Sequence, residues 1–176
     1  MKKITLFAAI IATIFTFEAC NNHETQAPKA ETSNLGPNDS LFTVNDAGYN
    51  FEIILPKDLM IMNAPEIDVN ESTGELHIHL GDQFWIVASQ EQMDMVAIKN
   101  ELAGDMLFTN KIVEESGNSI LVQRILPDGT TYDYSYQCLG MISGKPYIFK
   151  TSEDGEFSIE SVNRMRQAIN TVQQKA

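Results

Sequence analysis

Turn-forming residues at short, regular intervals are the feature that most restricts the fold of this chain. Between positions 49 and 150, glycine, asparagine, aspartate, serine and proline separate runs that are rich in β-branched and aromatic residues. Short runs joined by tight turns are typical of antiparallel hairpins. The predicted strands are residues 49–55, 66–69, 75–80, 83–88, 107–113, 119–126, 131–142 and 147–150.

One of these turns predicts a strand register. With Gly81-Asp82 as a two-residue loop, Ile78 pairs with Trp85 and Leu76 pairs with Val87. Directly paired residues share a face of the sheet, so these four side chains would form one apolar surface. The opposite, mixed face would then carry His77, His79, Phe84 and Ile86.

A second loop, Pro127-Asp128-Gly129, suits a type I turn with a glycine bulge. It would place Arg124 opposite Tyr132, with the guanidinium over the ring. The alternating tyrosines of this strand have two readings. They pack against neighbours as core, or they stack on a sugar or a peptide if their face is open. These tyrosines are Tyr132, Tyr134 and Tyr136.

Two segments predict helices. Residues 90–103 are rich in helix-forming residues and end before Gly104. The second helix begins after Ser158, a suitable N-cap, and its apolar residues recur at spacings of three and four. That stripe consists of Ile159, Val162, Met165, Ile169 and Val172. Strands, helix, strands and helix in this order predict an α+β domain, a meandering antiparallel sheet with helices packed on it.

The first twenty residues differ in character from the rest. Lys2 and Lys3 precede an apolar run that is too short to span a bilayer core of about 20 apolar residues. The run ends in Phe17, Glu18, Ala19 and Cys20. This ending resembles the lipobox of bacterial lipoproteins, although Phe17 and Glu18 depart from the usual leucine and small residue. The alternative is an ordinary signal peptide and a free secreted protein.

The resemblance implies residues 1–19 as a signal peptide and Cys20 as the lipid-attachment residue. It also implies a lipid-anchored protein at the outer membrane that faces the periplasm or the cell surface, since Asn21 does not favour inner-membrane retention. Residues 20–40 are polar and predict a disordered tether, followed by one domain over residues 41–176.

Charge restricts the partners of the processed chain. Without Lys2, Lys3 and Glu18, the 12 basic and 24 acidic residues become 10 and 23, a net charge of −13. Such a protein repels nucleic acid, and its electrostatic field favours cationic partners.

Cys138 has no cysteine to pair with once Cys20 is lipidated. We therefore expect Cys138 to behave as a small buried hydrophobic residue.

Between Tyr49 and Val172 the order of elements is similar to that of the PsbP-like fold, a meandering antiparallel sheet between helices. The similarity concerns the order of elements only. Because most members of that family are accessory or binding subunits, the resemblance implies a protein that is not an enzyme.

His77 and His79 form the only pair with metal-ligand spacing, because residues two apart on a strand point the same way. Glu75 shares their face and is the best third ligand. The other reading is a half-covered strand face with two hydrogen-bonded or solvated histidines. No G-x-S-x-G motif occurs, so a hydrolase would need a histidine beside a distant serine.

The sequence therefore predicts an envelope lipoprotein with a binding or accessory domain for a partner protein or small ligand, and predicts no cofactor. Two alternatives stay open, namely metal handling by His77, His79 and Glu75, and a hydrolase with a dispersed site.

Overall fold

The computed structural model describes residues 39–46 and 48–174. It contains ten strands and three helices over these residues, so the predicted α+β class is confirmed. The elements are β1 (Asp39–Asp46), β2 (Tyr49–Pro56), α1 (Lys57–Met62), β3 (Glu66–Val69), β4 (Leu76–His79), β5 (Trp85–Ser89), α2 (Met95–Gly104), β6 (Thr109–Glu115), β7 (Ser119–Ile125), β8 (Thr131–Ile142), β9 (Lys145–Thr151), α3 (Ile159–Ile169) and β10 (Gln173–Gln174). The predicted Cys20 site and signal peptide lie outside the described residues.

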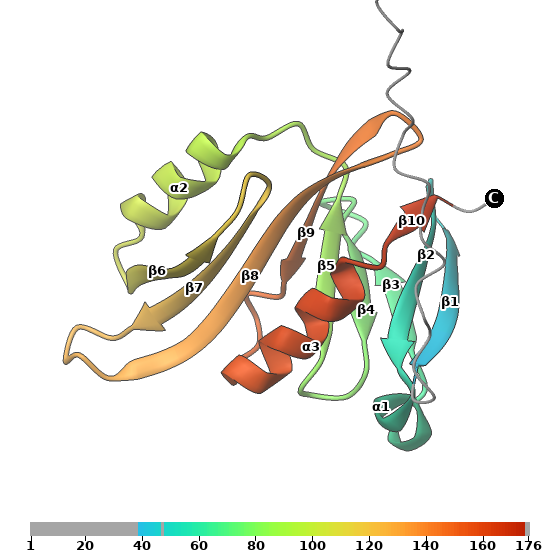
Figure 1. The fold of residues 1–176 in the computed structure, drawn as a ribbon, viewed down its shortest axis with the longest axis horizontal. Helices are drawn as coiled ribbons and strands as arrows, with labels where there is room; N and C mark the ends of the chain where they lie inside the picture. Colours follow the sequence, from blue (N-terminus) through green and yellow to red (C-terminus); the bar gives the residue numbers. More distant parts are fainter. Residues whose placement is uncertain (1–38, 47, 175–176) are drawn as a thin grey trace, which may run out of the picture. The chain divides into compact units, whose positions relative to one another are not determined.

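The strands form two antiparallel sheets. The larger has seven strands in the order β3-β4-β5-β9-β8-β7-β6, and the smaller has the order β1-β2-β10. Neighbours in the larger sheet are mostly consecutive hairpins, and β9 inserts between β5 and β8 (Figure 1). The meandering arrangement expected from the turns is therefore present.

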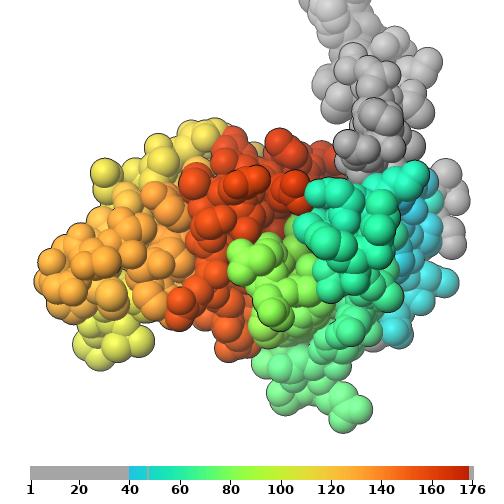
Figure 2. Space-filling model, turned by 90° about the horizontal axis from the view of Figure 1, so that it is seen from below, coloured from blue at the N-terminus to red at the C-terminus, as the bar shows by residue number. Residues whose placement is uncertain are grey.

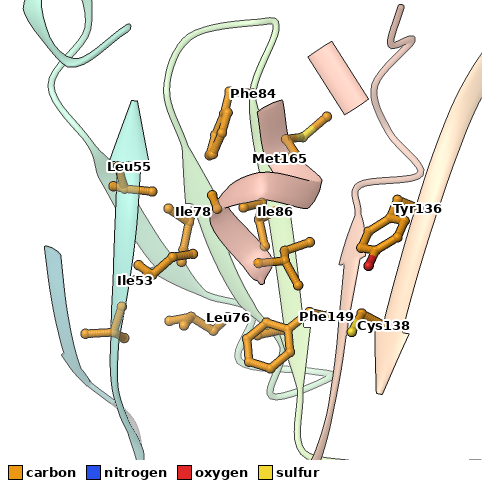
Figure 3. Packing of buried hydrophobic residues seen from close by; sticks show 14 of the residues in the cluster. Ile53, Leu55, Leu76, Ile78, Phe84, Ile86, Tyr136, Cys138, Phe149 and Met165 are labelled. Carbon is orange, nitrogen blue, oxygen red and sulfur yellow. The ribbon is translucent and has the colours of Figure 1, made fainter. Parts of the chain in front are cut away.

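The main core lies between one face of the seven-stranded sheet, β2 and α3. Helix α3 contacts β2, β8 and β9, and its residues Val162 and Met165 are fully buried. Sheet residues such as Ile78, Ile86 and Phe149 project toward them (Figure 3). In Figure 2 the atoms of α3 (red) lie between those of the β8 region (orange) and those of the β4–β5 region (green).

The start of α3 agrees with the prediction. Ser158 is the N-cap, and its hydroxyl accepts a hydrogen bond from the backbone N–H of Ser161 at 3.1 Å. The predicted stripe is correct at Val162, Met165 and Ile169 but wrong at Ile159, which is 38% exposed.

Helix α2 packs on the face of the sheet opposite α3. Ile98 is its only fully buried residue among those described, and it packs with Ile120 and Val122 of β7. The helix begins five residues later than predicted, at Met95, because the Asp94 side chain caps it by accepting from Ala97 N at 2.8 Å. Val96, predicted on the packed stripe, is 62% exposed.

The predicted register of the β4–β5 hairpin is wrong by one residue. Ile78 pairs with Ile86 and His79 pairs with Trp85, and Leu80 N donates to Phe84 O at 2.8 Å. The loop therefore has three residues rather than two. A shift of one residue exchanges the faces of a strand. Phe84 and Ile86 lie in the core, and Trp85 lies on the histidine face.

The β7–β8 register also differs from the prediction by one residue. A bulge between Arg124 and Ile125 pairs Arg124 with Asp133 instead of Tyr132. Tyr136 is buried in the core, and Tyr134 packs against the core. These two tyrosines therefore agree with the core reading. Tyr132 donates from its hydroxyl to Glu156 at 2.5 Å.

Three elements were not predicted, namely β1, α1 and the two-residue strand β10. Strand β1 pairs along its whole length with β2, and its first residues, Asp39 and Ser40, fall inside the predicted tether. The six-residue helix α1 has no buried residue and follows Pro56. Its polar and apolar residues do not repeat often enough to give a helical pattern.

Candidate functional site

A groove of about 800 Å³ lies on the sheet face opposite α3, beside α2. The C-terminal end of α2 and the loop after it form one wall, and the turn after β9 forms the other. Polar side chains of β6 to β9 form the floor. They include Asn110, Arg124, Ser135, Gln137 and Lys150.

Asp105 and Asn110 build the wall next to α2. Asp105 Oδ1 accepts from the backbone N–H groups of Leu107 at 2.8 Å and Phe108 at 3.1 Å. Asn110 Nδ2 donates to Asp105 Oδ2 and to Leu102 O, both at 2.9 Å. The second bond satisfies a carbonyl at the helix end, which has no partner within the helix. This wall is therefore held in place without a ligand.

The same contacts set the charge of Asp105. Burial raises its pKa, but the hydrogen bonds from Asn110, Leu107 and Phe108 and the charge of Arg124 outweigh it, so the pKa lies below the ordinary value. Asp105 is therefore an anion at neutral pH.

Asn110 also carries an unpaired acceptor. Its Oδ1 is buried and has no hydrogen-bond partner among the described residues. Buried polar atoms without a partner are rare, and each one needs an explanation. Asn110 lines the groove, but this oxygen has almost no exposed surface, so the unpaired acceptor lies within the wall itself.

Arg124 is held rigidly at one end of the floor. Its guanidinium forms two hydrogen bonds with Asp133, whose side chain is 1% exposed, and the Nε–Oδ1 distance is 2.5 Å. The guanidinium also lies 5.1 Å from the ring centre of Phe108 and 5.6 Å from that of Tyr132, as expected for Tyr132 from the sequence. The hydrogen bond to Asp133 raises the pKa of Arg124, and the pair is neutral overall.

Lys150 is the second cation of the floor, and it is also paired. Its Nζ lies 3.2 Å from Glu153 Oε1 and 3.5 Å from Glu75 Oε1. Burial alone would lower the pKa of Lys150, but the two carboxylates raise it overall. Both cations of the groove are thus already compensated by protein carboxylates.

Three further carboxylates, two along the groove and one in the hollows next to it, have no such partner. Glu91, Glu101 and Asp154 form no ion pair with any described basic side chain. Glu101 lies on α2, and Asp154 lies in the turn on the other side of the groove. The groove is therefore acidic.

The groove continues into two smaller hollows. The first, of about 160 Å³, shares Gln137 and Lys150 with the large groove. The second, of about 350 Å³, shares Glu91 and Met93 with the first. Its lining is largely apolar and includes Met93, Leu139, Met141, Pro146 and Tyr147.

The predicted histidine pair lies outside this groove. His77 and His79 share a face, with ring centres 6.2 Å apart. Trp85, which the corrected register brings to this face, donates from Nε1 to His77 Nδ1 at 3.1 Å, and its ring centre is 4.0 Å from that of His79. His77 Nε2 is buried without a partner among the described residues.

The structure gives the metal hypothesis no further ligands. Glu75 is engaged by Thr73 at 3.0 Å and by Lys150. Within residues 39–46 and 48–174, no three histidine, cysteine, aspartate or glutamate side chains are grouped so that they could hold an ion. In the same ranges neither His77 nor His79 hydrogen-bonds a serine, and His79 Nε2 is 3.6 Å from Asp68. The geometry therefore favours neither the metal nor the hydrolase reading.

Cys138 lies in the core and is 9% exposed. Burial raises the pKa of its thiol, which disfavours the nucleophilic thiolate.

The described part of the chain has no helix long and apolar enough to cross a membrane.

The sequence did not indicate the groove. Asn110, Gln137 and Lys150 are ordinary polar residues of strands, and only the packing of α2 over β6 and β7 encloses them. The spacing of Asp105 ahead of two backbone donors is a local signal of a side-chain-capped loop that could have been recognised.

Comparison of the chain with protein-family models, with curated proteins and with solved structures found no match.

Proposed function

We propose that this protein is an envelope lipoprotein, anchored at the outer membrane through Cys20, whose domain binds a ligand or partner protein in the groove beside α2. The sequence supports the anchor, because an apolar run closes at Ala19 and Cys20 and a polar segment follows. The polar segment would hold the domain away from the membrane.

The groove is the observation that carries the binding role. It is large enough for a ligand, and its wall is fixed by Asp105 and Asn110. Its side chains do not resemble a catalytic set. A nucleophile needs a base within hydrogen-bond reach, and the described groove residues include no histidine or cysteine.

Site-specific photocrosslinking in intact cells tests the binding role. A photoreactive amino acid at Gln137, on the groove floor, should capture a defined partner or ligand. The matched control is the same substitution at Gln167, which is exposed on α3 away from the groove. Equal capture at the two positions, or no capture at Gln137, contradicts the proposal.

Mass spectrometry of the native protein tests the anchor. We expect a mature chain that begins at Cys20 and carries acyl mass, and we expect Cys20→Ser to abolish both the acyl mass and the membrane association. A native protein that begins elsewhere without acyl mass contradicts the anchor but leaves the groove proposal to be judged by the crosslinking.

A further inference from the structure

We infer that the ligand of the groove is a basic, amphipathic peptide segment of a partner protein. This inference rests on the proposed function, since it names the chemistry that the same groove would recognise. It depends on two properties of the groove, namely the arrangement of charge and the apolar end.

The arrangement of charge selects for cations. Glu101 and Asp154 approach the groove from different elements, α2 and the turn after β9, and Glu91 lies farther along. None of the three has a basic partner among the described residues. Lysine or arginine side chains of a ligand would supply the missing partners, and the net charge of the protein would attract them.

The same arrangement disfavours an anionic ligand. Arg124 and Lys150 are the basic side chains that line the groove, and Asp133, Glu75 and Glu153 already compensate their charges. A phosphate or carboxylate would have to break these pairs while it approached uncompensated carboxylates. We therefore exclude nucleotides and acidic peptides as the preferred ligands.

The apolar end favours a peptide over a free polyamine. The hollow beyond Glu91 is lined by Met93, Leu139 and Met141, and methionine suits adaptable contact with varied apolar groups. At the polar end, Leu107 lines the groove and is 73% exposed. A polyamine carries charge along its whole length, whereas a peptide can place apolar side chains beside its cations.

Fluorescence anisotropy with labelled synthetic peptides tests the inference. The protein is the chain from residue 20 onward with Cys20→Ser, so that no acyl chain binds the peptide. The probe is a peptide of about eight residues that alternates lysine and leucine, long enough to occupy an extended groove. Glutamate–leucine and lysine–serine peptides of the same length are the comparisons. We expect binding of the lysine–leucine peptide that weakens with salt, and about tenfold weaker binding of both comparisons.

Charge-matched variants separate the groove from the general field of the protein. Glu101→Gln with Asp154→Asn should weaken binding of the lysine–leucine peptide about fivefold, the effect of losing two exposed charge contacts. Glu71→Gln with Asp82→Asn removes the same charge from exposed turns outside the groove and should leave the affinity within about twofold.

Equal losses in the two double variants, or equal binding of the glutamate–leucine peptide, would overturn the inference. The two proposals fail separately. If crosslinking at Gln137 captures a partner but the lysine–leucine peptide does not bind, the binding function stands and the basic-peptide inference is wrong. If the peptide binds but Gln137 captures nothing in cells, the groove has this affinity but the proposed function is wrong.

Discussion

Asp133, a side chain that is 1% exposed, holds the guanidinium of Arg124 at the end of the groove through two hydrogen bonds. A bulge in β8, where Tyr132 has no partner in β7, makes this pairing possible, because it places Arg124 and Asp133 directly opposite each other. The pair fixes the orientation of Arg124, on which the rings of Phe108 and Tyr132 pack.

Removing the arginine should be costly. Arg124→Met leaves the carboxylate of Asp133 buried without a partner, and we expect the free energy of unfolding to fall by about 3–5 kcal/mol in urea denaturation. Arg164→Met is the control, since its partner Asp58 is exposed and the loss should be about 0–1 kcal/mol. The double variant Arg124→Met with Asp133→Leu should recover most of the stability. Similar losses for the two single variants would contradict this account.

His79 should make stability depend on pH. Burial lowers its pKa, and the charges of Asp68 and Glu66, which raise it, do not compensate. The unfolded chain therefore binds the proton more readily, and the stability from neutral His79 is lost as pH falls from about 6.5 through the folded pKa. Urea denaturation at about pH 7.5 and about pH 5 should show a smaller pH-dependent loss in His79→Gln than in the wild type. An identical loss would contradict the prediction.

Asp105 should control the order of the groove wall. Asp105→Ala removes the acceptor of Leu107 N and Phe108 N, and we expect faster amide exchange at both residues and a loss of about 1 kcal/mol in stability. Asp128→Ala removes a similar loop contact, to Thr130 N, and should leave the exchange at Leu107 unchanged.

The charge of Asp105 gives this prediction a pH dependence. Its pKa is lowered in the folded protein, so the contribution is present above the unfolded value of 3.8 and is lost as pH falls through the folded value. Protection of Leu107 and Phe108 that is independent of Asp105 would show that another contact orders the wall.

Local signals predicted the elements well and the faces poorly. The bounds of β8 and the cap of α3 agree with the structure because alternation and N-capping are local properties. The loop after β4 adds a third residue, with Gly81 at φ +63°, and a Cβ there would lie 2.9 Å from Nδ2 of Asn63. Asn63, which limits the space at Gly81, is the C-cap residue of α1 and lies outside the hairpin. No pattern within the hairpin itself could therefore specify the loop length.

The groove could not be predicted for a related reason. Its floor consists of strand residues, and a register shift of one residue decides which face of the sheet their side chains occupy. Its wall depends on where α2 packs. Asn110 illustrates the point, because the residue gains its role only by bonding Leu102 O at the end of α2. Long-range packing sets both relationships, and composition does not encode them.

The corrected register can be tested at two adjacent residues. Phe84 is fully buried in the core, whereas Trp85 is only partly buried on the opposite face. Phe84→Ala should therefore reduce the free energy of unfolding by about 3–5 kcal/mol, and Trp85→Ala should cost clearly less although it removes a larger side chain. The two-residue loop predicts the reverse order, because it would place Trp85 in the core. Chemical denaturation followed by circular dichroism measures both variants without depending on tryptophan fluorescence, and a larger loss for Trp85→Ala would reject the observed pairing of His79 with Trp85.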